Sequence, residues 1–87
     1  MADLKGGRDV VMPPEVSRLV LKGATLPRAL RKWRGLTQVQ LAEMTGLAQS
    51  YLSEMEVQEG KKGTAEARIK IAQALDVPPD WLVGNDA

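Results

Sequence analysis

The chain's 87 residues suffice for one small domain, since a chain of this size buries only about two-thirds of its surface on folding. It contains no cysteine and no histidine, which excludes disulfides, thiolate or imidazole metal sites and histidine-based triads, so we predict no catalytic residue, metal or cofactor. The net charge is only +1, but residues 1–35 hold eight basic and three acidic residues, which permits one electropositive face. Apolar runs are too short for a membrane span, so we expect a soluble, cytoplasmic protein.

The apolar pattern predicts an all-α fold, a compact bundle of about five to six short helices without a strand. Prolines suit a first helical turn, threonines can cap a helix start, and glycines end helices. These signals place the expected helices, in chain order, at 13–23, 26–34, 38–45, 49–57, 65–75 and 80–83. The cap positions of three of them are filled by Thr25, Thr37 and Thr64. Gln40 completes a capping box with Thr37.

The domain organisation follows from these elements. We expect a flexible N-terminal tail at 1–12, an extra N-terminal helix at 13–24, one compact domain at 25–84 and a C-terminal tail at 85–87. In the helix at 65–75 the spacing of the apolar residues predicts a buried face. Its members are Ile69, Ala72 and Leu75, with Ile71 beside them.

The helices at 38–45 and 49–57 are separated by about three residues, and the residue types there predict a tight crossing near a right angle. Ala42 is small where the second helix must approach the first. Gly46 can adopt the positive φ that turns the chain within a few residues. The angle between the helices is expected to be filled by Leu47, Leu52 and Met55. Together these residues predict a helix-turn-helix.

This set of residues resembles the helix-turn-helix family of phage repressors and Cro-like proteins. The resemblance covers about residues 26–83 and leaves 1–24 outside it. It is carried by Gly35-Leu36-Thr37-Gln38, Leu41-Ala42, Thr45-Gly46-Leu47, Tyr51-Leu52, Met55-Glu56, Ala74-Leu75-Asp76-Val77 and Asp80-Trp81-Leu82. It implies a lambda-repressor-like DNA-binding domain at 25–84 and sequence-specific binding of double-stranded DNA.

The resemblance further implies that the helix at 49–57 enters the major groove with its first turn facing the base edges. Gln49 and Ser50 have the chemistry for this, since a glutamine amide can pair with adenine N6 and N7. Gln38 matches the family's phosphate-clamping glutamine, at a helix start whose N–H groups also face the anion. The other expected DNA contacts are Thr37, Tyr51, Ser53, Lys61 and Lys62.

A further implication is an ion pair between Arg31 and Glu56, whose role is orientation rather than net stability. The neighbouring cations Arg28, Lys32 and Arg34 are expected on a surface that steers DNA.

Three departures from the family pattern affect this region. Ala48 stands where many relatives have a serine or threonine cap, and Glu54 puts a carboxylate on a face that can meet DNA. Three residues, 57–59, precede Gly60 where the family usually has one, which affects the placement of Lys61 and Lys62.

Three functions remain open at this point. The first is a transcriptional regulator, a repressor, that binds a palindromic operator as a homodimer, because one small module buries too little for tight selective binding. Residues 78–83 are the candidate dimer surface. The second is the antitoxin of a toxin–antitoxin module that binds its own operator and a toxin protein, for which the segment 13–23 leaves room. The third is a protein-interaction adaptor with the same fold, which the low net charge and Glu54 favour.

Overall fold

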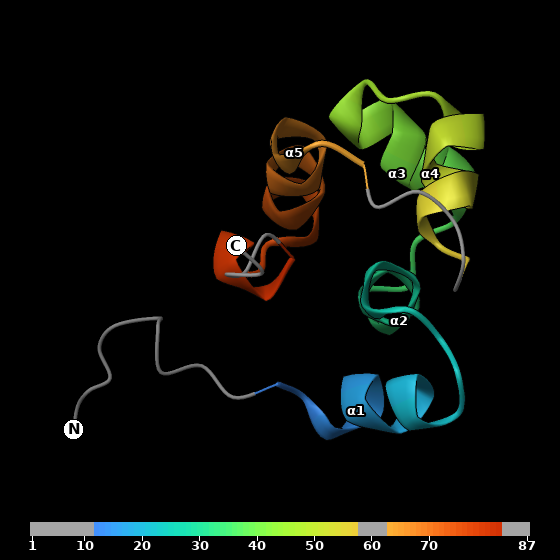
Figure 1. The fold of residues 1–87 in the computed structure, drawn as a ribbon, viewed down its shortest axis with the longest axis vertical. Coiled ribbons are helices and arrows are strands. Elements are labelled where there is room, and N and C mark those ends of the chain that lie inside the picture. Colours follow the sequence, from blue (N-terminus) through green and yellow to red (C-terminus); the bar gives the residue numbers. More distant parts are fainter. Residues whose placement is uncertain (1–11, 58–62, 83–87) are drawn as a thin grey trace, which may run out of the picture.

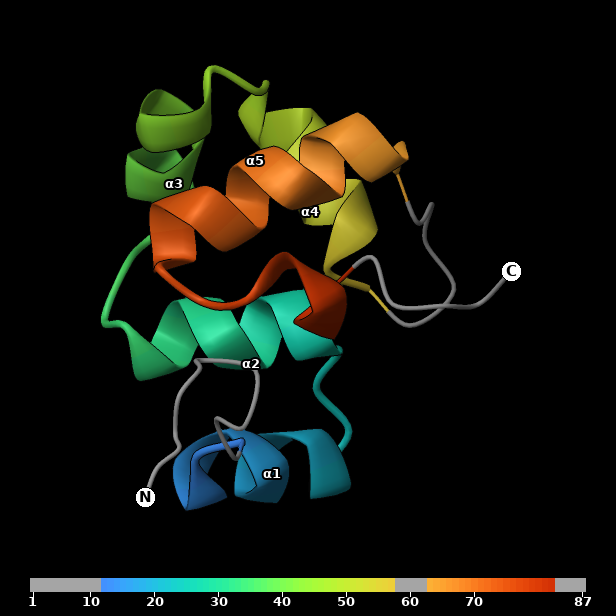
Figure 2. The ribbon, with the colours of Figure 1, turned by 90° about the vertical axis from the view of Figure 1, so that its left-hand side faces the viewer.

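The computed structural model describes residues 12–57 and 63–82. This part of the chain contains five α-helices and one short 3-10 helix. In chain order they are α1 (Pro14–Leu21), α2 (Leu26–Trp33), α3 (Gln38–Thr45), α4 (Gln49–Met55), α5 (Ala65–Leu75) and η2 (Pro79–Trp81). This described part contains no strand, which confirms the all-α prediction. Figures 1 and 2 show α3, α4 and α5 at one end, α1 at the other, and α2 between them.

Local signals set the starts of α2, α3 and α5 and the end of α3 as predicted. The hydroxyls of Thr25, Thr37 and Thr64 each accept a hydrogen bond from the backbone N–H three residues later. The Thr37 N–H in turn donates to Gln40 Oε1 at 2.9 Å, which completes the capping box. Gly46 ends α3 with φ 78°, a conformation that strains any residue with a Cβ. These four signals act within a few residues of each helix end, so sequence alone could identify them.

Other helix bounds differ from the prediction. α1 begins one residue late and ends two residues early, and α2 ends one residue early. α4 ends at Met55, two residues early. The Glu56 N–H shares its bond between the carbonyls of Leu52 and Ser53, the tightened geometry of a last turn, and the Glu56 carbonyl accepts from the Thr25 hydroxyl instead of continuing the helix. The last helix is a 3-10 turn that begins at Pro79, where proline suits the first helical position, rather than an α-helix at 80–83.

The predicted inward face of α5 is partly wrong. Ile69 is 37% exposed, whereas Ala67, Ile71 and Leu75, four residues apart, are buried together with Ala72. The buried face is rotated because α5 is covered by α2, α3 and η2, and these neighbours decide which of its apolar residues turn inward.

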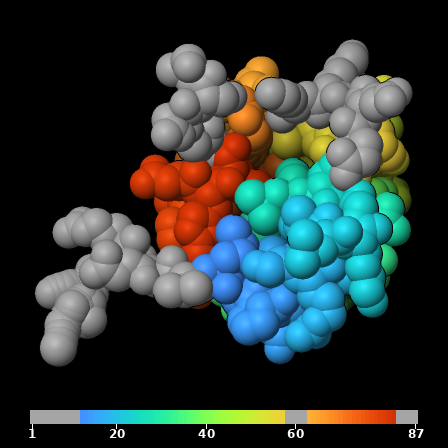
Figure 3. Space-filling view, turned by 60° about the horizontal axis from the view of Figure 1, so that its bottom comes forward, coloured from blue at the N-terminus to red at the C-terminus, as the bar shows by residue number. Residues whose placement is uncertain are grey.

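The N-terminal helix α1 packs against α2, and the two form one continuous surface (Figure 3). Val16 is fully buried, and Leu19 lies partly buried against the same core. The segment 13–24 therefore contributes side chains to the core. The predicted tails at 1–12 and 85–87 lie outside the described residues, except for Met12, which packs against the core.

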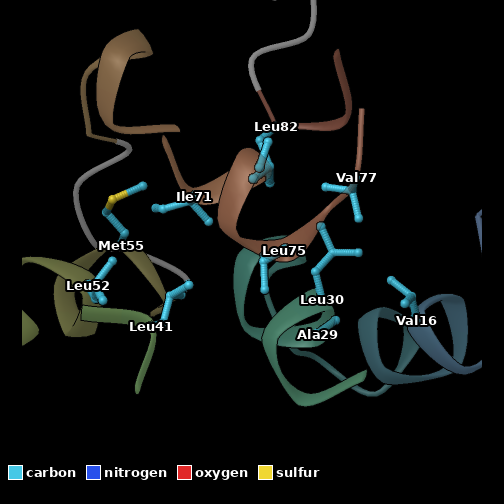
Figure 4. Packing of buried hydrophobic residues seen from close by; sticks show 11 residues of the cluster. Val16, Ala29, Leu30, Leu41, Leu52, Met55, Ile71, Leu75, Val77 and Leu82 are labelled. Atoms are coloured by element: carbon cyan, nitrogen blue, oxygen red, sulfur yellow. The ribbon is translucent and has the colours of Figure 1, made fainter. Parts of the chain in front are cut away.

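One hydrophobic core connects all five α-helices (Figure 4). Its largest fully buried side chains are Val16, Leu30, Leu41, Leu52, Ile71 and Leu75. Burying one such side chain contributes about 1.5–3 kcal/mol, so each helix is held mainly by this packing. Within the described residues no helix is long and apolar enough to cross a lipid bilayer.

Candidate nucleic-acid interface

The corner between α3 and α4 consists of three residues held by local hydrogen bonds. The Gly46 N–H donates to the Ala42 carbonyl at 2.8 Å. The Thr45 hydroxyl donates to the Leu41 carbonyl at 2.8 Å and accepts from the Leu47 N–H at 3.2 Å, so it bridges the corner. These bonds fix the point at which the chain leaves α3 and enters α4.

The side chains at this corner pack as the helix-turn-helix pattern requires. Leu52 and Met55 of α4 are buried at 1% and 5% exposure. Ala42 and Leu47 lie half-buried against the same core. One face of α4 is thus buried in the core, and exposed side chains on its other faces can contact another molecule.

The first turn of α4 projects polar side chains into solvent. Gln49 and Ser50 are both exposed, and so is Ser53 one turn later. Ala48 precedes the helix without a side-chain cap, as its residue type predicts, so its side chain bonds none of the first N–H groups. This end of α4 presents amide, hydroxyl and backbone donors side by side, the group types that read base edges and bind phosphate.

The opposite end of α4 is tied down through Glu56. Arg31 Nε donates to Glu56 Oε2 at 2.7 Å and Arg31 Nη2 to Oε1 at 2.9 Å, so the ion pair is bidentate. The two residues are 9% and 3% exposed. Arg31 Nη1 also donates to the Leu36 carbonyl at 2.8 Å, and the Thr25 hydroxyl donates to the Glu56 carbonyl at 3.0 Å. We call these contacts the Glu56 network; they join α4 to α2 and to the segments on both sides of α2.

Gln38 lies between the Glu56 network and the exposed turn. Its Nε2 donates to Glu56 Oε1 at 3.1 Å, and its Oε1 accepts from Gln49 Nε2 at 3.5 Å. The second bond is at the distance limit and is the weaker one, so it is the bond that a ligand can replace. A phosphate oxygen accepts hydrogen bonds, so the expected phosphate contact of Gln38 must come from the second N–H of its Nε2, beside the one that Glu56 accepts.

Tyr51 serves a contact inside the protein. Its side chain is half-buried, and its hydroxyl accepts a hydrogen bond from the Thr64 N–H at 3.0 Å, at the cap of α5. Gly63 makes room for this contact, because a Cβ there would lie 3.0 Å from the Tyr51 hydroxyl and 2.8 Å from Met55 Sδ. Sequence reasoning missed this role, although a glycine directly before a threonine cap was a possible signal.

The remaining predicted residues divide into four groups. The Thr37 hydroxyl oxygen accepts the Gln40 N–H in the capping box, and its own O–H is not used in that bond. Lys61 and Lys62 lie outside the described residues. Arg34 donates to the carbonyls of Leu75 and Asp76 at 2.7 and 2.9 Å, so it binds the end of α5 rather than standing free. Arg28 and Lys32 are exposed on α2. No group of three or more acidic side chains suited to a metal ion occurs in the described ranges.

Comparison with protein-family models identifies a helix-turn-helix family of the Cro/C1 type, whose model matches residues 28–82. The match runs from the first turn of α2 through η2 and includes the α3–α4 corner, the exposed turn of α4 and most of the Glu56 network. Searches of curated proteins and of solved structures found no match. The matched range is more than half of the chain, and α1 lies outside it.

Proposed function

Because this chain belongs to the Cro/C1-type helix-turn-helix family of DNA-binding transcription regulators, we propose that it is a sequence-specific repressor that reads double-stranded DNA with α4. The observation that carries this proposal is the exposure of Gln49 and Ser50 on a helix whose other end is buried and bonded. A helix that reads a groove needs such a combination of a free polar leading turn and a rigid support.

The proposed contacts follow from the chemistry of each position. The Gln49 amide pairs with adenine N6 and N7 in the major groove, a contact that discriminates by about 1–3 kcal/mol, and Ser50 bonds a neighbouring base edge. Gln38 and Thr37 approach a phosphate at the start of α3, and Ser53 approaches one beside α4. Tyr51 positions the segment after α4 through its bond to Thr64.

Two further parts of the proposal concern the assembly. A homodimer on a palindromic operator doubles the contact, because one domain of this size buries too little surface for tight selective binding. We place the dimer contact around η2, where Pro79 and Asp80 are exposed beside the half-buried Trp81. Lys61 and Lys62 contribute contacts to the DNA backbone that are independent of base sequence.

Selection from random duplexes, followed by binding measurements on the selected site, tests the proposal. We expect an operator with two symmetric halves and a log–log salt slope steeper than about −4, as several phosphate contacts require. Gln49→Ala should lose preference at one or two base positions while its stability changes by less than about 0.5 kcal/mol. Gln73→Ala, the same change at an exposed glutamine of α5, is the matched control and should leave preference intact. Binding without salt dependence, or an unchanged preference in Gln49→Ala, contradicts the proposal.

A second function, antitoxin action, is favoured by one observation on α1. Leu21 is 85% and Val20 40% exposed, beside a shallow apolar hollow of about 390 Å³ that Met12 and Leu26 also line. Exposed apolar surface of this kind marks protein contacts, and it lies outside the family match. Co-purification with the protein encoded next to this one, abolished in Leu21→Asp while duplex binding persists, is the expected result for an antitoxin.

A further inference from the structure

A second hollow, of about 430 Å³, lies where the connection between α1 and α2 meets the end of α4. Three basic residues line it: Lys22, Arg28 and Lys32. Glu56 and Val57, directly after α4, form the opposite wall. The bond of 3.0 Å from the Thr25 hydroxyl to the Glu56 carbonyl holds the two walls together. We call this feature the basic hollow.

The positive charge of the basic hollow is not neutralised by the described residues. Lys22, Arg28 and Lys32 are exposed, and within residues 12–57 and 63–82 none of their side chains forms an ion pair or a hydrogen bond. The one carboxylate in its lining, Glu56, is already paired with Arg31 at 2.7 Å. Arg28 and Lys32 lie four residues apart on one face of α2, where like charges repel. An anion in the hollow would relieve this repulsion.

The backbone of the basic hollow is firmly placed. The Lys22 N–H donates to the carbonyls of Arg18 and Leu19, each at 3.1 Å, so Lys22 closes the end of α1. Val16 anchors α1 with a fully buried side chain. Arg28 and Lys32 stand on α2, whose Leu30 is fully buried. The three cations therefore stand on rigid elements, and only their side chains need to be ordered when an anion binds.

The position of the basic hollow, next to the C-terminal end of α4, indicates which anion it binds. The seven residues of α4 span roughly 10 Å, and the major groove is about 12 Å wide. With Gln49 and Ser50 on the base edges, the other end of α4 reaches the border of the groove, where the sugar–phosphate backbone runs. The hollow lies at that end.

We propose that Lys22, Arg28 and Lys32 bind the backbone phosphates that border the groove occupied by α4. Through Lys22, α1 then extends the DNA contact beyond the helix-turn-helix module that the family match covers. This inference rests on the proposed function, since the hollow can lie at a groove border only if α4 lies in the groove. Its contacts are independent of base sequence, because every phosphate is alike.

The salt dependence of duplex binding tests this inference. The triple variant Lys22→Gln, Arg28→Gln, Lys32→Gln removes the charges and keeps polar side chains of similar length. Fluorescence anisotropy with a mixed-sequence duplex of about 24 base pairs should show a log–log slope that is two to three units shallower than that of the unmodified chain, since each phosphate contributes about 0.9. At about 0.1 M salt the affinity should fall roughly fivefold to tenfold for each phosphate that the variant no longer binds. The base preference found by selection should not change.

Lys70→Gln is the matched control, because Lys70 is an exposed cation on α5 that does not line the basic hollow. Its slope should equal that of the unmodified chain. A steep slope in the unmodified chain that persists in the triple variant overturns this inference alone, whereas absence of salt-dependent binding in the unmodified chain overturns the proposed function. If the triple variant unfolds, Lys22→Gln alone decides: a slope shallower by about one unit supports the contact from α1, and an unchanged slope overturns it.

Discussion

The two ends of α4 are built in opposite ways. At its start, Ala48 provides no cap, and Gln49 and Ser50 are exposed. At its end, Met55 and Glu56 are 5% and 3% exposed, and Glu56 bonds to α2 and α3. The difference teaches that a helix can be held rigidly from one end while the other end keeps its donors and acceptors for a ligand. Capping the start with a side chain would stabilise the helix but occupy N–H groups at the end proposed to contact DNA.

The two ends also differ in the kind of interaction that they use. Apolar packing alone can hold a helix against its neighbours but still permits small rotations of the helix about its axis. A bidentate ion pair has one preferred geometry and therefore restricts such rotations. A buried ion pair gains little net stability over apolar packing, which fits a role in fixing the orientation of α4. The comparison between the ends can be tested by weakening one end and strengthening the other.

The largest effect is expected at the buried end. Glu56→Ala removes the two carboxylate oxygens that accept from Arg31 and leaves a buried guanidinium with the Leu36 carbonyl alone, which should cost about 3–5 kcal/mol of unfolding free energy. Urea unfolding followed by circular dichroism measures the change. The double variant Arg31→Met, Glu56→Leu is the control and should recover most of the loss. A loss below about 1 kcal/mol in Glu56→Ala would show that the Glu56 network does not anchor α4.

An intermediate effect is expected where the segment after α4 meets α5. Gly63 has φ +78°, and a Cβ there would lie 2.8 Å from Met55 Sδ, whereas Gly35 has φ +75° and no atom within 4 Å of its Cβ position. Gly35→Ala should cost about 1–2 kcal/mol from backbone strain alone. Gly63→Ala should cost at least about 1 kcal/mol more, because Met55 and Tyr51 must shift. Equal losses in thermal or urea unfolding would show that this close contact is unimportant.

The smallest effect is expected at the exposed end. Ala48 has the extended conformation of a cap, with φ −67° and ψ 143°, so Ala48→Ser should supply the missing cap and stabilise the protein by about 0.5–1 kcal/mol. Its melting temperature should rise by a few degrees. Thr37→Ala is the counterpart at α3 and should lose about 1 kcal/mol with its capping box. An unchanged melting temperature in Ala48→Ser would mean that the start of α4 is already satisfied in another way.

The sequence by itself determined the features whose causes act within a few residues. Thr25, Thr37 and Thr64 cap the helices that follow them, and Gly46 turns the corner, as predicted. Gln49 and Ser50 are exposed where the helix-turn-helix pattern expects them. The resemblance to the family also paired Arg31 with Glu56, which no local signal could have done.

Apart from the Arg31–Glu56 pair, the tertiary structure alone decided which residues far apart in the chain meet. Thr25 bonds Glu56, Arg34 bonds the end of α5, and Tyr51 bonds Thr64 across separations of 31, 41 and 13 residues. The basic hollow brings Lys22 beside Arg28 and Lys32 in the same way, and the neighbours of α5 turned Ile69 outward. Caps and turns depend on backbone groups a few residues away, whereas these contacts depend on how the helices stack around the core, which no local pattern contains.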